Sequence, residues 1–160
     1  MKKVFLPFFL IGAMSTLAAT GTGTATVTIV SPLAIGNSIQ DMSFGKINAV
    51  SGGTVSIGTN GSRTKTGNLV LVNGGSVSEA KFSVSGDPSA TYSITLPAAA
   101  ATLSNGSSSL PLSDFVSDPT SAGALSGGSG TIHVGGTLTV GSGQAGGTYT
   151  GTFAVTVEYN

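Results

Sequence analysis

His133 is the first candidate for a catalytic side chain, because it is the only histidine in the chain. Serines are plentiful and four aspartates are present, so a Ser-His-Asp set is possible by residue count. His133 stands between Ile132 and Val134 in an alternating segment, which predicts a strand residue that faces solvent, opposite the apolar side chains. No Gly-x-Ser-x-Gly elbow accompanies it between a strand and a helix. The pattern argues against a hydrolase.

Metal binding and glycoside hydrolysis find no better support in the residue types. The chain has no cysteine, one histidine and no acidic cluster with calcium-loop spacing. Glu158 lies on the threonine face of the last segment and Glu79 follows a Gly-Ser loop, so both are interpreted as solubilising charges rather than paired catalytic carboxylates. Asn60-Gly-Ser62 and Asn105-Gly-Ser107 match a glycosylation sequon, but we interpret them as hairpin turns. We expect no enzyme activity, cofactor or metal.

The charge content restricts the classes of partner. Charged residues make up 8% of the chain, against about 25% in ordinary domains. Beyond the two lysines near the start, four basic residues remain against six acidic ones, and the basic ones are scattered. Nucleic-acid binding needs clustered cations to displace phosphate counterions, so no nucleic-acid partner is expected.

Residues 1–19 have the layout of a secretory signal peptide. Lys2 and Lys3 precede an apolar stretch from 4 to 17, and the small residues Ala18 and Ala19 follow. A membrane anchor would need roughly 20 apolar residues, which is longer than this stretch. We therefore expect cleavage after Ala19, no stable membrane span afterwards, and export through the periplasm to the cell surface or medium.

Apolar residues recur at every second position along most of the chain, which is the spacing of strands with one buried face. Glycine contributes 25 residues, many of them in turn-like stretches with Ser and Asn. Helix signals are almost absent, and no fixed repeat indicates a β-solenoid. Short strands at close spacing predict a single all-β domain over residues 31–160, with a β-sandwich architecture. The alternation is seen at 55–57, 82–84, 92–96, 132–134 and 138–140.

The two ends of the expected exported chain are both extended in character. Residues 20–30 alternate threonine with glycine or apolar residues, and would span about 36 Å as a strand. Gly21 and Gly23 weaken this segment as an independent strand, so it needs a partner edge. The closing residues 149–159 place their apolar side chains on one face. Residues 153–157 carry neither the charge nor the proline that usually protects an exposed edge.

Three motifs resemble a family of exported bacterial β-sandwich proteins, catalogued as domain of unknown function 4402. They are Phe44-Gly45 with its neighbours from Asp41 to Ile47, the stretch Gln144 to Gly151, and the terminal Phe-Ala-Val-Thr-Val-Glu-Tyr-Asn. The same motifs are similar to those of spore-coat-U-type proteins and archaic chaperone–usher pilins. The resemblance covers essentially the whole chain after the signal peptide.

The resemblance implies an antiparallel, immunoglobulin-like sandwich that lacks one strand and is completed by a donated one. Residues 20–30 would be the donor strand, and the last strand would form the acceptor groove and bind a periplasmic chaperone. An outer-membrane usher would be a second partner. The implied donor side chains are Ala25, Val27 and Ile29, and the implied acceptor side chains are Phe153, Val155, Val157 and Tyr159. Such head-to-tail insertion does not close on itself, so it builds a filament.

Two functions remain open from the sequence. The first is a structural subunit of a pilus-like surface fibre, which polymerises with copies of itself or related subunits by strand exchange. The second is a self-contained secreted or surface β-sandwich that acts as a binding or adhesion module. Many pilins of these classes carry a disulfide and this chain has no cysteine. The sequence offers about nine or ten strand-like segments, so residues 20–30 could also pair within their own subunit.

Overall fold

The computed structural model of the protein describes residues 19–160. The predicted signal peptide falls, except for Ala19, outside the described residues. From residue 19 onward the chain has strands and no helix, which confirms the prediction of an all-β fold. The strands are β1 (Ala34–Gln40), β2 (Ser43–Asn48), β3 (Gly53–Ile57), β4 (Arg63–Lys65), β5 (Val70–Ser78), β6 (Ala80–Ser85), β7 (Thr91–Thr95), β8 (Ala101–Ser104), β9 (Ser109–Asp118), β10 (Ala122–Ala124), β11 (Ser129–Val140) and β12 (Thr156–Tyr159).

The strands form three antiparallel sheets. The largest follows the order β1-β6-β11-β3-β4, with β9 paired to β11 and β8 paired to β9. A three-stranded sheet has the order β10-β7-β12, and β2 pairs with β5 in a two-stranded ribbon. No helix in the part of the chain that the structure describes is long and apolar enough to span a membrane.

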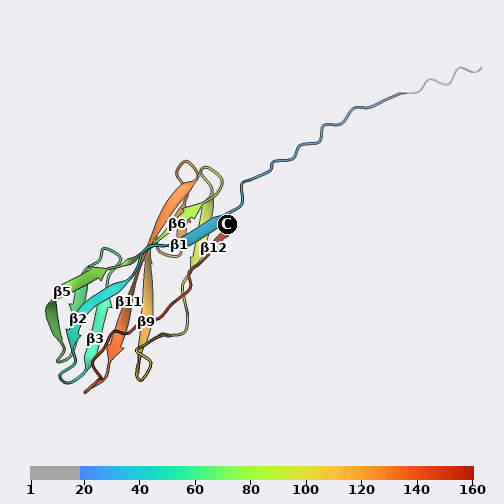
Figure 1. The fold of residues 1–160 in the computed structure, drawn as a ribbon. Coiled ribbons are helices and arrows are strands. Elements are labelled where there is room, and N and C mark those ends of the chain that lie inside the picture. Colours follow the sequence, from blue (N-terminus) through green and yellow to red (C-terminus); the bar gives the residue numbers. More distant parts are fainter. Residues whose placement is uncertain (1–18) are drawn as a thin grey trace, which may run out of the picture.

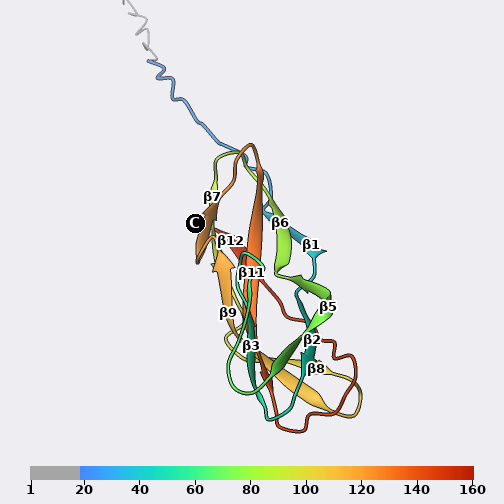
Figure 2. The same cartoon turned by 90° about the vertical axis from the view of Figure 1, so that its left-hand side faces the viewer.

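Strand β11 organises the large sheet and runs along much of the molecule (Figure 2). Its first half pairs with β6 and its second half pairs with β3. Gly135 lies at the change of partner, where a Cβ atom would collide with the backbone oxygen of Ile57. The sequence pattern indicated two apolar pairs, at 132–134 and 138–140. The structure joins them in one strand, because glycine permits the close backbone approach between them.

The core consists of two apolar clusters between the large sheet and the two smaller ones, as expected of a β-sandwich. One cluster joins β2, β3, β9 and the second half of β11, and the other joins β6, β7 and the first half of β11. The alternation predicted that the apolar residues at 55, 57, 132, 134, 138 and 140 face the core. All six are buried. Met42, Phe115 and Phe153 contact both clusters.

The two Asn-Gly pairs form turns, as predicted. The Asn60 side-chain oxygen accepts a hydrogen bond from the Ser62 amide at 3.1 Å, and Asn105 accepts from the amides of Ser107 and Ser108. The glycine that follows each asparagine has a positive φ, a conformation that glycine adopts without steric cost.

Residues 19–33 lie outside the sheets. Residues 19–32 are exposed and belong to no strand, and they leave the body of the domain at the end that carries the C-terminus (Figure 1). Val27 is 83% exposed and Ile29 is 90% exposed. The alternative in which residues 20–30 pair within their own sheet is therefore not the arrangement of this structure.

Candidate strand-binding groove

The C-terminal segment forms a regular strand over only part of its predicted length. The sequence pattern predicted a strand from Tyr149 to Tyr159, whereas β12 covers Thr156–Tyr159. Thr150 makes an isolated antiparallel bridge to Ser104. Residues 151–155, between these two anchors, belong to no strand pair within residues 19–160. The neighbouring β7 ends at Thr95, so it offers no further backbone to this stretch.

The side chains of this segment nevertheless keep the predicted alternation. Phe153, Val155, Val157 and Tyr159 are half-buried, while the residues between them are exposed. Phe153 packs edge-on against Phe82 with ring centroids 6.1 Å apart, and its ring lies 4.9 Å from that of Phe115. The segment therefore alternates half-buried and exposed side chains as a strand does, although the backbone of residues 151–155 pairs with no strand in the described chain.

Strand β12 has one free edge. Asn160 donates its backbone N–H to Thr91 of β7 at 3.2 Å, while Ile94, which stands opposite Val157, donates to Ser121 beyond β10 at 2.8 Å. Backbone groups alternate between the two edges of an antiparallel strand. The N–H and C=O groups of Val157 and Tyr159 therefore face away from β7. Within its sheet β12 stands at the edge, next to β7 only.

Strand β1 presents a second edge on the other side of the same opening. It pairs with β6 and with no other strand of the described chain, which leaves its far side unpaired. Between β1, β2 and the C-terminal segment lies a groove of about 740 Å³, lined by residues 35–44 on one side and 149–155 on the other. Core side chains form its floor, including Phe44, Ala80 and Leu112. The groove therefore reaches down to residues of both core clusters, which are themselves buried.

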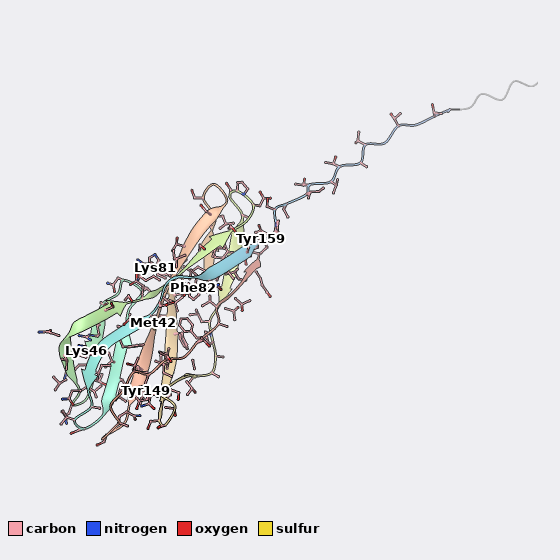
Figure 3. The ribbon with its side chains drawn as sticks, viewed as in Figure 1. Met42, Lys46, Lys81, Phe82, Tyr149 and Tyr159 are labelled. Atoms are coloured by element: carbon pink, nitrogen blue, oxygen red, sulfur yellow. The ribbon has the colours of Figure 1, made fainter. Side chains whose placement is uncertain are left out.

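A second hollow continues the groove toward the other end of the molecule. It has a volume of about 670 Å³ and lies between β2 and residues 144–149. It shares Met42, Phe44, Leu103 and Tyr149 with the first groove, so the two form one channel. In Figure 3, Phe82 and Met42 lie between Tyr159 near one end and Tyr149 near the other. We call the combined channel the edge groove.

Tyr159 lies beyond the residues that line the edge groove, near the point where the N-terminal segment leaves the domain (Figure 3). Its hydroxyl donates a hydrogen bond to the carbonyl of Ser31 at 2.8 Å and accepts one from the amide of Asp87 at 2.7 Å. A Cβ atom at Gly86 would collide with this hydroxyl. The sequence assigned Tyr159 to the groove, and its tie to Ser31 was not foreseen because 128 residues separate the two.

A charged cluster lies apart from the edge groove and corrects two expectations. Glu79, interpreted from sequence as a solubilising surface charge, is 7% exposed. Its carboxylate lies 3.3 Å from Lys81 Nζ and 3.2 Å from His133 Nδ1. His133, expected to face solvent, is half-buried because its ring turns toward Glu79. Among residues 19–160 no group of three His, Cys, Asp or Glu side chains is arranged to hold a metal ion.

The electrostatics of this cluster favour the ionised carboxylate. The backbone amide of Glu79 lowers the pKa of its side chain, burial opposes that effect, and His133 and Lys81 lower the pKa further. The cluster links β6 to the neighbouring strand β11, because Lys81 of β6 and His133 of β11 are cross-strand partners. It acts as a structural ion pair in this geometry.

The fold and the groove define a class of protein, an antiparallel β-sandwich-like domain with an unpaired edge and an extended N-terminal segment. The family described as a domain of unknown function, DUF4402, matches residues 33–159, and the chain belongs to this family. The match starts at the residue before β1. No curated protein and no solved structure matches the chain significantly.

Proposed function

We propose that this protein is a structural subunit of a pilus-like surface fibre, in which residues 20–30 of one copy occupy the edge groove of the next. The observation that carries the proposal is the pairing of an open, core-lined groove with an unpaired apolar extension on the same chain. The proposal extends the resemblance to spore-coat-U-type proteins and archaic chaperone–usher pilins that the sequence motifs suggested, beyond the family of unknown function that the chain belongs to.

The groove supports the proposal because both of its edges lack partners. The backbone groups of residues 151–155 and the outward groups of β12 form no strand pairs in the described chain. A strand inserted between β1 and the C-terminal segment would supply those hydrogen bonds and cover the half-buried apolar side chains that line the groove. Strand addition of this kind draws affinity from the backbone and specificity from alternate side chains.

The extension has the length and the pattern that the groove requires. Residues 20–30 and residues 149–159 are equally long, about 36 Å each when extended, and the groove itself is lined by residues 149–155 of the C-terminal segment. Ala25, Val27 and Ile29 lie on one face of the extension and threonines on the other. Burial of the valine and isoleucine side chains would contribute about 1.5 to 3 kcal/mol each.

Other features agree with export and assembly outside the cytoplasm. The predicted signal peptide directs the chain to the periplasm, where a chaperone would cover the groove until an usher joins the subunits. The chain has no cysteine, so assembly would need no oxidation. Each copy would give its extension to one neighbour and receive one from another, and this head-to-tail contact extends without closing.

The test uses two variants with complementary defects. Deletion of residues 20–30 removes the donor and leaves the groove, while Val155→Asp places a charge in the groove and leaves the donor. We expect each variant alone to remain monomeric on unheated denaturing gels, where the unmodified protein forms a ladder. A mixture of the two should form dimers and no longer species, because only one of the possible insertions is complete.

Two outcomes would contradict the proposal. A ladder that persists after deletion of residues 20–30 would show that another surface joins the copies. A stable monomer from the unmodified chain, with the same behaviour after the deletion, would instead favour the self-contained binding module. Thermal unfolding of each variant serves as the control for folding.

A further inference from the structure

We propose that Tyr159 is a latch that holds the N-terminal extension out of its own groove, so that the extension remains available to a second copy. This inference rests on the proposed function, because it concerns how the same extension is kept free for insertion in trans. Tyr159 is a positioning residue in this account.

The need for such a latch follows from where the extension begins. Ser31 lies three residues before β1, which forms one wall of the groove, and contacts the last residue of β12 near the other wall. A reversal of the chain at residues 31–33 would lay residues 20–30 antiparallel to β1, inside their own groove. Connections of two to five residues are common in hairpins, so this reversal is sterically accessible.

Self-insertion would also have a large concentration advantage. A segment tethered by a short connection has an effective concentration in the millimolar range. A second copy at micromolar concentration would compete about a thousandfold less well for the same groove. Each contact that disfavours the hairpin therefore shifts the balance toward a second copy, and the Tyr159 hydroxyl contributes roughly two- to tenfold of that shift.

The hydrogen bond from Tyr159 acts on the group that this hairpin would use. Ser-Pro pairs favour the start of a turn, and a turn over residues 31–34 would direct the carbonyl of Ser31 to the amide of Ala34. In the structure that carbonyl accepts the Tyr159 hydroxyl at 2.8 Å instead. The amide of Asp87 holds the hydroxyl in place from the other side at 2.7 Å. Figure 3 shows Tyr159 at the point where the extension leaves the domain.

Gly86 provides the space that the latch needs. A Cβ atom there would collide with the Tyr159 hydroxyl and would approach Leu125 and Leu33. Gly86→Ala should therefore displace the hydroxyl by steric conflict, while Tyr159→Phe removes it. The two substitutions disturb the same contact by different means, so a shared result would not depend on the side effects of either one, and thermal unfolding of both variants controls for folding.

The experiment measures where the extension lies in dilute monomer. Thr24→Cys and Thr152→Cys introduce two spin labels into a chain that has no cysteine of its own. In the latched state seven extended residues separate each label from the Ser31–Tyr159 contact, so the labels lie roughly 45 Å apart. In a self-inserted chain residue 24 lies beside residue 153, and the labels come within about 10 Å.

We expect the long distance alone in the otherwise unmodified chain. Tyr159→Phe and Gly86→Ala should each add a detectable short-distance population, because loss of one hydrogen bond shifts the balance between the two states roughly two- to tenfold. Glu158→Gln, an exposed neighbour on the same strand, is the matched control and should show the long distance alone. A short distance in the parent chain, or unchanged distances in both latch variants, would overturn the latch.

A peptide of residues 20–30, added to the variant that lacks those residues, separates this inference from the function on which it rests. If the peptide binds but neither latch variant self-inserts, the latch is wrong and strand donation stands. If the peptide does not bind, strand donation fails and the latch fails with it.

Discussion

Phe153 is the side chain at which the two core clusters and the groove meet. Its ring packs against Phe82 and Phe115, and it contacts both clusters while one side remains open to the groove. The sequence placed it on the apolar face of the last segment, and that placement is correct. The ring contacts could not be predicted, because Phe82 and Phe115 lie on strands far away along the chain.

Replacement of Phe153 by alanine should destabilise the fold by about 2 kcal/mol, below the range for a fully buried phenylalanine because the ring is half-exposed. Phe153→Leu keeps most of the apolar volume and should cost less than half as much. Urea unfolding of both variants measures the difference. Equal stability of Phe153→Ala and the parent would show that the ring does not join the two clusters.

Glu79 gives a prediction that depends on pH. Its pKa is lowered in the folded state, so the stabilisation is complete above the ordinary value of 4.5 and is lost as the pH falls through the folded value. Glu79→Gln should reduce the free energy of unfolding by about 1 kcal/mol at neutral pH. The difference from the parent should shrink progressively below pH 4.5.

Denaturant unfolding over this pH range tests the point, with Glu158→Gln as the control for an exposed carboxylate. A difference between Glu79→Gln and the parent that stays constant into strongly acidic solution would refute the role given to the ionised carboxylate. The sequence interpretation of Glu79 failed because His133 lies 54 residues away. The Gly-Gly-Ser sequence before Glu79 indicated a loop, whereas β5 continues through it to Ser78, and local pattern says nothing of a distant partner.

At the scale of elements, the alternation predicted which side chains of the C-terminal segment face inward and did not predict where backbone pairing stops. Side-chain period is a local property, so it is visible in residues 149–159 themselves. Pairing depends on the neighbour, and β7 ends at Thr95 shortly before Pro97, which has no N–H to donate. Strands β3, β6, β7 and β11 were predictable for the same reason, since each carries its own alternation, whereas β2 and β9 also contribute to the core and were not among the predicted segments.

The two faces of the extension should differ in their tolerance of charge. Val27→Asp should abolish assembly, because it would place a charge in an apolar groove. Thr26→Asp introduces the same charge on the opposite face and should leave assembly largely intact. Electron microscopy and unheated denaturing gels of both variants provide the comparison. Normal fibres from Val27→Asp, or equal defects in both, would count against insertion of that face.

At the scale of the whole molecule, the extension and the sandwich should be energetically separate in the monomer. Residues 19–30 are all exposed, and a Cβ atom at Gly21 or Gly23 would meet nothing within 4 Å. Deletion of residues 20–30 should therefore change the melting temperature of dilute monomer by no more than about 2 °C. A large decrease measured by circular dichroism would show that the extension already stabilises its own domain.

The lengthwise course of the groove, with β1 along one wall and the C-terminal segment along the other, sets how a join between copies would bear tension. Traction along the fibre would enter a subunit at Ser31 and pull the inserted strand parallel to its neighbours. All the hydrogen bonds between that strand and its neighbours would then be loaded in shear at the same time. In peeling they would break one after another. A fibre built in this way would resist stretching without any covalent link between its parts.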